Sequence, residues 1–115
     1  MRKVRRQPDA EIADVLLDQS IFAGVGNIIK NEVLFRTRTS PFTLVRDVSS
    51  RRLRAIADDA RAFSFRFLEL RRTFSLRKHL EVYGKSVCTA CGGRITRRVH
   101  GTRGRRSFFC AVCQR

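Results

Sequence analysis

Four cysteines are the residues whose type and spacing best suit a defined chemistry in this chain. Cys88 and Cys91 form one Cys-x-x-Cys pair, Cys110 and Cys113 form a second, and 18 residues separate the two pairs. Four thiolates at this spacing are typical of a tetrahedral structural zinc site in which each pair occupies one tight turn. The sequence therefore predicts one structural Zn²⁺ with these four cysteines as its ligands.

Other uses of the cysteines explain the pattern less completely. A redox Cys-x-x-Cys accounts for one pair and not for two, and disulfides belong to secreted proteins. Iron held by two Cys-x-x-Cys turns remains the rival metal. His79 and His100 are not expected to be ligands, because four thiolates complete the coordination. A closed site leaves no position for a reacting water, so we expect the metal to stiffen the segment between the pairs rather than to catalyse.

A second stretch, Gly24-Val25-Gly26-Asn27, comes directly before a predicted helix. The first N–H groups of a helix have no partner within the helix, and its dipole favours an anion at that end. Glycines would let a phosphate approach those donors, and the Asn27 side chain could cap the helix or donate to the same phosphate. A plain turn with an N-cap explains the same residues, so this short motif alone leaves both interpretations open.

The charge of the chain favours a polyanionic partner. The net charge is +15, from 25 lysines and arginines against 10 aspartates and glutamates, and no acidic residue follows Glu81. A solvated basic surface is the simpler alternative. Arginine outnumbers lysine, and guanidinium groups suit phosphate better than ammonium groups do, so nucleic acid is the expected partner. No apolar run is long enough to cross a bilayer and the first residues lack a signal-peptide core, which predicts a cytoplasmic, nucleoid-associated protein.

Periodicity predicts three helices followed by a β-hairpin. A short helix is expected after Pro8-Asp9, a second beyond Gly26, and a long third one capped by Ser49 or Ser50. The apolar residues of the long helix recur at steps of three and four: Leu53, Ile56, Ala60, Phe63, Phe67 and Leu70. The expected buried residues of the first two helices are Ile12, Val15 and Leu16, and Ile28, Ile29, Val33, Leu34 and Phe35. From Tyr83 onward, glycines separate two short β-type segments, around residues 94–99 and 107–110.

The complete pattern is more specific than any of its parts. The stretch "LLDQSIFAGVGNIIKNEVLFRTRTSP", followed by the cysteine quartet that ends in "FFCAVCQ", resembles the formamidopyrimidine-DNA glycosylase / endonuclease VIII family. The resemblance extends from about Asp9 to Gln114 and corresponds to the C-terminal half of that family. It implies a mainly α fold with a small β-hairpin zinc ribbon: a helix–two-turn–helix DNA-binding module over residues 1–82 and a four-cysteine zinc finger over residues 83–115.

The resemblance also implies roles for individual residues. Asn27 matches the family asparagine that binds a phosphate beside the lesion. Arg105, five residues before Cys110, matches the zinc-finger arginine that grips the phosphates of the damaged nucleotide. Gly26 and Lys30 are expected to assist, the glycine by its backbone N–H and the lysine by its charge. The segment before Arg105 is about two residues longer than is usual in the family, so Arg105 and Arg106 could exchange roles.

The family's catalytic residues are not found in this chain. They are an N-terminal proline whose amine attacks the sugar, a following glutamate and a lysine of the same N-terminal domain. Here the sequence begins Met1-Arg2-Lys3, and the nitrogen of Pro8 is an amide. We therefore expect a module that grips damaged double-stranded DNA and lacks the catalytic half. Two alternatives remain: an active DNA glycosylase/AP lyase completed by another polypeptide or by a missing N-terminal half, and a zinc-ribbon adaptor that binds protein or RNA.

Overall fold

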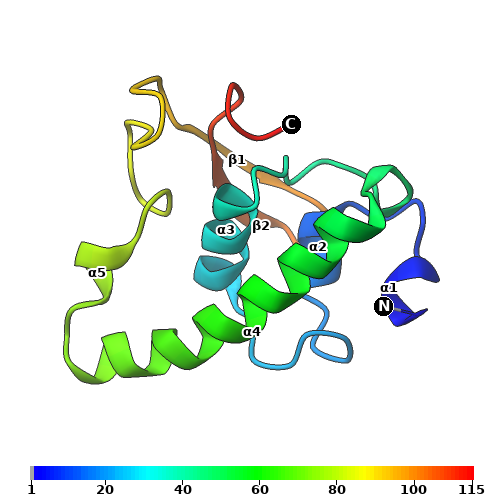
Figure 1. Ribbon diagram of the computed structural model, residues 1–115. Helices are drawn as coiled ribbons and strands as arrows, with labels where there is room; N and C mark the ends of the chain where they lie inside the picture. Colours follow the sequence, from blue (N-terminus) through cyan, green and yellow to red (C-terminus); the bar gives the residue numbers. More distant parts are fainter. Residues whose placement is uncertain (1) are drawn as a thin grey trace.

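The computed structural model describes residues 2–115, so Met1 lies outside the described residues. Mainly helical segments come first and a two-stranded hairpin comes last (Figure 1). In the described part of the chain, no helix combines the length and the apolar character needed to cross a membrane. The elements are α1 (Arg2–Arg5), α2 (Ile12–Leu16), α3 (Asn27–Arg36), the 3-10 helix η1 (Val45–Asp47), α4 (Ser50–Arg72), α5 (Leu76–His79), β1 (Thr96–His100) and β2 (Arg105–Phe109).

The longest helix, α4, begins and faces the interior as its sequence predicts. The Ser49 hydroxyl accepts a hydrogen bond from the backbone N–H of Arg52 at 3.1 Å, so Ser49 rather than Ser50 is the N-cap. This bond satisfies one of the donors that a helix N-terminus leaves unpaired. The buried positions of α4 are spaced by three, four and seven residues, which places them on one side of the helix: Leu53, Ile56, Ala60, Phe63 and Leu70.

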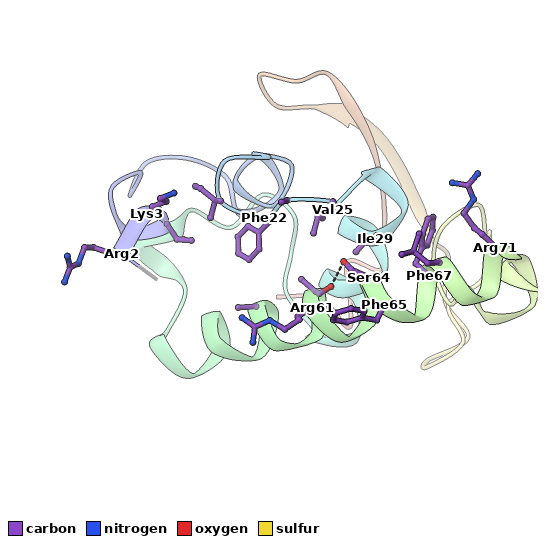
Figure 2. Close-up of a pocket in the computed structure, with 17 residues that line it drawn as sticks. Arg2, Lys3, Phe22, Val25, Ile29, Arg61, Ser64, Phe65, Phe67 and Arg71 are labelled. Carbon is purple, nitrogen blue, oxygen red and sulfur yellow. Dashed lines mark hydrogen bonds between the residues drawn. The ribbon is translucent and has the colours of Figure 1, made fainter.

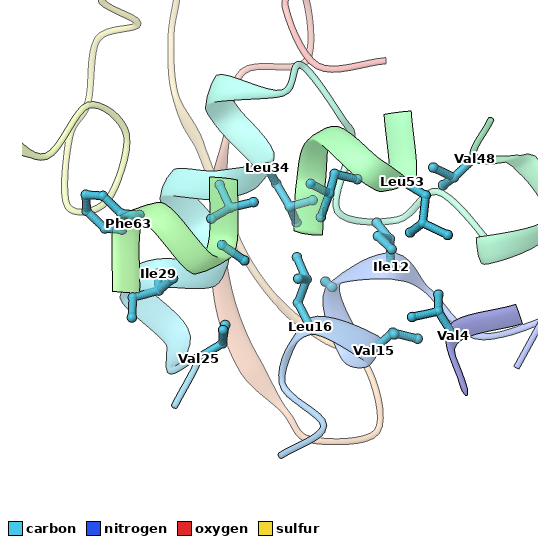
Figure 3. Packing of buried hydrophobic residues seen from close by; sticks show 14 of the residues in the cluster. Val4, Ile12, Val15, Leu16, Val25, Ile29, Leu34, Val48, Leu53 and Phe63 are labelled. Atoms are coloured by element: carbon cyan, nitrogen blue, oxygen red, sulfur yellow. The ribbon is translucent and has the colours of Figure 1, made fainter. Parts of the chain in front are cut away.

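The main hydrophobic core lies where α2, α3 and α4 meet. Although α2 has five residues, Ile12 and Leu16 are fully buried in this core. Figure 3 shows these side chains pointing toward Leu34 of α3 and Leu53 of α4. Such contacts, rather than intrinsic propensity, stabilise a helix as short as α2.

The hairpin packs on the other side of α3, which thus lies between α4 and the strands (Figure 1). β1 and β2 pair antiparallel from Thr96 opposite Phe109 to His100 opposite Arg105. Pairing therefore continues closer to the tip than the predicted segments 94–99 and 107–110, because Gly101 and Gly104 close the turn with φ of 78° and 58°. The division of the chain at residues 82 and 83 stays a prediction.

Glu32 is a structural residue that the sequence pattern did not single out. Its side chain is fully buried on α3, and its carboxylate accepts three backbone hydrogen bonds of 2.7–3.0 Å from Glu81, Val82 and Tyr83. Arg36, one turn later, places a guanidinium nitrogen 3.7 Å from the same carboxylate. Glu32 therefore holds the segment that leads from α5 into the hairpin against α3.

Glu32→Ala is expected to lower the free energy of unfolding by about 3 kcal/mol, because it leaves one buried and two part-buried N–H groups without an acceptor. Glu69→Ala is the matched control, since Glu69 forms an exposed ion pair with Arg72 that is worth about 0.5 kcal/mol at most. Urea unfolding of both variants followed by circular dichroism measures the difference. Equal losses in the two variants would contradict the assigned role of Glu32.

Candidate nucleic-acid interface

The four cysteines converge on one point of the structure. All four Sγ atoms lie within 4.8 Å of one another. The Sγ atoms of Cys91 and Cys110 are 3.6 Å apart and those of Cys88 and Cys113 are 3.8 Å apart. A tetrahedral ion with metal–sulfur bonds of about 2.3 Å needs sulfur–sulfur edges of about 3.8 Å. The spacing of the thiols therefore fits a metal ion held by four sulfurs.

Backbone geometry shapes both cysteine turns for this arrangement. In the first turn, the N–H of Gly92 donates to the carbonyl of Cys88, and the N–H of Gly93 points at Cys91 Sγ over 3.4 Å. Gly92 has φ of 77°, which side-chain-bearing residues rarely adopt. In the second turn, the N–H of Cys113 points at Cys110 Sγ over 3.5 Å. Donors directed at sulfur favour its thiolate form, which is the form that binds metals.

Gln114 attaches the second cysteine turn to the helical part of the chain. Its side chain is 3% exposed. Its Oε1 accepts from the backbone N–H of Cys110 at 2.9 Å, and its Nε2 donates to the carbonyl of Thr39 at 2.9 Å. This role of Gln114 was not predicted, although an amide directly after the last cysteine is visible in the sequence.

The N-terminus of α3 is open. Gly26 is the N-cap residue and Asn27 is the first helical residue, and no side chain of residues 2–115 caps this helix. Gly26 has φ of −95° and a Cβ added to it would meet nothing within 4 Å, so packing inside the protein does not require glycine there. Gly24, by contrast, has φ of 85°, a left-handed conformation that glycine adopts without steric strain. Because Gly26 has no side chain, there is space beside the unpaired backbone N–H groups of the first turn of α3.

Gln19 fixes the turn that precedes this open helix end. Its Oε1 accepts from the N–H of Gly24 at 3.0 Å, and its Nε2 donates to the carbonyl of Val25 at 2.8 Å. A side chain that bonds two consecutive residues of the loop reduces the freedom of this glycine-bearing segment. The approach to the α3 N-terminus is therefore held in shape by contacts within the chain.

Asn27 and Arg106, which the sequence placed in one candidate site, are in direct contact. The Asn27 side chain donates from Nδ2 to the backbone carbonyl of Arg106 at 2.9 Å. The same carbonyl oxygen lies 3.2 Å from Asn31 Nδ2 and 3.3 Å from Lys30 Nζ. Asn31 Oδ1 in turn accepts from the backbone N–H of Phe108. One side of α3 therefore binds the backbone of β2 through three neighbouring side chains.

Lys30 lies beneath the hairpin rather than at the surface. Its side chain is 1% exposed, and its Nζ donates to the hydroxyl of Ser107 at 2.7 Å. Burial lowers the pKa of Lys30 to about 8, an effect that nearby Asp14 and Glu11 oppose and Arg105 reinforces. The sequence suggested a lysine that assists a phosphate by its charge. The structure places this charge under the strand that carries the candidate arginines.

Arg105 and Arg106 are both exposed, but they point to opposite faces of the hairpin. Side chains alternate along a strand, so Arg105 shares a face with Ser107, which is fully buried against α3. Arg106 shares the other face with Phe108, whose ring packs against Tyr83. Arg105 therefore stands on the face that turns toward the helices, and Arg106 on the face that turns away from α3.

A groove with a volume of about 890 Å³ lies on another part of the surface, between α1, the segment from Ile21 to Val25, and α4. Figure 2 shows Phe22 and Val25 pointing across it toward α4. Phe65 and Leu68 of α4 line it although they are 74% and 68% exposed. Its remaining lining includes four basic side chains: Arg2, Lys3, Arg61 and Arg71.

Comparison with known proteins assigns this arrangement of helices and hairpin to a family. The formamidopyrimidine-DNA glycosylase H2TH domain matches residues 1–73. Endonuclease 8-like 3 of Homo sapiens is 36% identical over 114 residues, which cover 98% of this chain and 19% of the human protein. Formamidopyrimidine-DNA glycosylase of Pelotomaculum thermopropionicum is 30% identical, over all of this chain and 46% of that protein.

Solved structures show the same fold. The Lactococcus lactis formamidopyrimidine-DNA glycosylase, non-covalently bound to DNA containing an AP site, superposes with a TM-score of 0.88 at 29% identity and covers 98% of this chain. The Thermus thermophilus enzyme superposes with a TM-score of 0.85 at 30% identity. The chain spans 43% and 47% of these two structures. The helix–two-turn–helix fold with a hairpin and four clustered cysteines is confirmed, and the chain belongs to the formamidopyrimidine-DNA glycosylase / endonuclease VIII-like family.

Titration of Lys30 tests its burial directly. Because the pKa of Lys30 is about 8 in the folded chain and 10.5 when unperturbed, the unfolded chain holds more protons between these values. The free energy of unfolding of the wild type, relative to Lys30→Met, should therefore rise with pH across this window. Urea unfolding at several pH values measures this difference, and NMR of the lysine side chains should show one midpoint near 8. A difference that does not change with pH would contradict the buried position.

Proposed function

We propose that this chain is the DNA-binding module of a base-excision-repair DNA glycosylase/AP lyase and grips the phosphates of damaged double-stranded DNA. The observation that carries the proposal is the contact between Asn27 and the Arg106 carbonyl. It brings the open N-terminus of α3 next to β2, the strand that carries Arg105 and Arg106. Relatives of the same fold have been solved with AP-site DNA, which supports DNA as the partner.

Each part of this surface suits a phosphate. The uncapped N-terminus of α3 offers backbone N–H groups and the positive end of the helix dipole. Asn27 has a second amide hydrogen that remains after its bond to Arg106. Arg105 supplies a planar fork of donors, which binds phosphate oxygens in pairs. Gripping neighbouring phosphates from two elements would hold the backbone in the bent form from which a damaged base can leave the stack.

We also propose that the four clustered cysteines hold one structural Zn²⁺. Four thiolates and no open position suit zinc, and its bonds would supply folding free energy to a hairpin that has little core of its own. Cys88, Cys91, Cys110 and Cys113 would fix the open end of the hairpin, at the opposite end from the turn. The metal therefore acts on DNA binding through the position of β2.

Fluorescence anisotropy with two matched duplexes, one carrying an abasic-site analogue, tests the proposed grip. Asn27→Ala and Arg105→Ala should each weaken binding about tenfold, and Arg105→Ala, which removes a positive charge, should also lower the slope of log affinity against log salt by about 1. Arg97→Ala is the matched control, because Arg97 is an exposed arginine of the paired strand. If Arg106→Ala loses more DNA affinity than Arg105→Ala does, Arg106 rather than Arg105 makes the main phosphate contact.

The outcomes separate the possible functions. Tighter binding to the abasic duplex means that this surface recognises damage, whereas equal, salt-sensitive binding means a general DNA clamp. Losses in Asn27→Ala and Arg105→Ala no greater than the loss in Arg97→Ala would overturn the grip. Absence of binding to either duplex would overturn the proposal and favour the adaptor that binds protein or RNA.

Cys88→Ser is expected to release the metal and to weaken DNA binding, because three thiolates no longer close the site around Zn²⁺. Thr89→Ser, at the next position of the same turn, is the control. Elemental analysis of the purified variants measures the zinc content, and the same anisotropy assay measures affinity. Full zinc content with wild-type affinity in Cys88→Ser would contradict the zinc-scaffold proposal.

The groove beside α4 supports a second candidate function, an active glycosylase/lyase completed by a catalytic half. Phe65 and Leu68 are exposed apolar side chains in a groove with a basic rim, and a protein surface could cover them. Borohydride trapping on an abasic duplex would detect the Schiff base of such an enzyme. Trapping that requires a supplied N-terminal half, and fails with Leu68→Glu, would establish this assembly.

A further inference from the structure

We propose that Lys30, Ser107 and His100 are positioning residues that set where Arg105 stands above α3. They form a buried hydrogen-bonded relay between α3 and the two strands of the hairpin. This inference rests on the proposed function, because it explains how the arginine that would grip phosphate is held. None of the three residues is itself offered as a phosphate ligand.

Ser107 is the centre of the relay. Its side chain is fully buried, and its hydroxyl lies 2.7 Å from Lys30 Nζ and 2.6 Å from His100 Nε2. The other ring nitrogen of His100 lies 2.9 Å from a carboxylate oxygen of Glu11, the N-cap residue of α2. The relay therefore connects α3, β2, β1 and the start of α2 in one unbroken series of contacts.

One set of proton positions satisfies every donor and acceptor of the relay. The Lys30 ammonium has only hydrogens to give, so it donates to the Ser107 hydroxyl oxygen. The hydroxyl hydrogen is then free to donate to His100 Nε2. A neutral imidazole that accepts at Nε2 carries its hydrogen on Nδ1 and donates it to the Glu11 carboxylate. Every group in the series has a partner, so the relay specifies one orientation of the hairpin.

Contacts at the hairpin tip hold the same orientation. Asp14 of α2 accepts from both the backbone N–H and the hydroxyl of Thr102, at 3.1 and 3.2 Å. The backbone at Gly101 lies so close that an added Cβ would be 2.5 Å from an Asp14 carboxylate oxygen. The ring of Phe42 packs on His100 with the centroids 4.3 Å apart. The strands therefore have little freedom to slide or tilt over α2 and α3.

The relay is placed to act on the arginines. Ser107 and Arg105 are two positions apart on β2 and share one face, so a shift of Ser107 moves Arg105 with it. Lys30 Nζ also lies 3.3 Å from the backbone carbonyl of Arg106, the residue between Arg105 and Ser107. A buried polar series of this kind is not the most stabilising choice, because apolar residues of similar volume often stabilise a core as well or better. The hydrogen-bonded series fixes the position of the hairpin over α3, which an apolar core would not do to the same degree.

The charge of Lys30 gives the relay a pH dependence that can be measured. The charged groups that face Lys30 are Asp14 and Glu11 on the α2 side and Arg105 on β2, with His100 reached through Ser107. Burial lowers the pKa of Lys30 to about 8. Above this pH the ammonium loses a hydrogen and its positive charge. The hydrogen bond to Ser107 is then no longer charge-assisted, so the support beneath Arg105 and the affinity for phosphate should fall even though the folded chain gains stability relative to Lys30→Met.

The anisotropy assay with the abasic-analogue duplex tests the relay. Ser107→Ala should weaken binding about tenfold, the change expected when a charge-assisted hydrogen bond is lost. Ser107→Thr keeps the hydroxyl and should restore affinity to within about twofold, since an intact hydrogen bond leaves little energetic difference. Thr96→Ala, which removes an exposed hydroxyl from the paired strand, should bind as the wild type does. A purely structural Ser107 would give folded variants whose affinity is unchanged.

Wild-type affinity measured from pH 7 to pH 9 supplies a readout that needs no variant. It should fall as the pH rises through about 8, and Lys30→Met should lack this step. A flat wild-type profile, together with a lysine midpoint near 8 observed by NMR, overturns the relay even if Ser107→Ala fails to fold. If Ser107→Ala and Lys30→Met are folded and metal-loaded and bind DNA as tightly as the wild type, the relay is overturned. The proposed function stays intact in that case. Failure of the wild type to bind either duplex overturns the proposed function itself.

Discussion

The carbonyl oxygen of Arg106 is the point on which the rest of this structure depends. Asn27, Lys30 and Asn31 of α3 all direct N–H groups at it, over 2.9–3.3 Å. A carbonyl oxygen has two lone pairs, so three donors more than satisfy it and the hairpin stays attached if one donor turns away. The junction joins the open end of a helix to a basic strand. Neither element alone would present a surface on which neighbouring phosphates could be held.

The hairpin is supported at three places along its length. The cysteine turns close its open end, and Gln114 ties them to Thr39 of the helical part. The relay through Ser107 supports its middle, and Asp14 holds its tip. Two isolated strands are marginally stable in water, so such a hairpin needs supports from outside itself. The position of the candidate arginines thus follows from the packing of the whole chain.

Sequence reasoning succeeded where the cause of structure is local. The cysteine spacing predicted the clustering of the four thiols, the apolar period predicted α4, and the glycine motif indicated the start of α3. It failed where the partner is distant in sequence. Lys30 was expected to assist a phosphate by its charge, whereas its burial depends on Ser107, 77 residues further on. Glu32 likewise acquires its role from backbone donors about 50 residues away. Those pairs become visible once the hairpin is folded onto α3.

Amide chemical shifts during a titration with a short abasic-analogue duplex test the central claim most directly. If the α3 N-terminus and β2 form one phosphate-binding surface, the amides of Ile28, Ile29, Arg105 and Arg106 should shift together and saturate at one equivalent of duplex. Changes confined to the groove around Phe65, or changes at the hairpin without changes at the start of α3, would contradict the account.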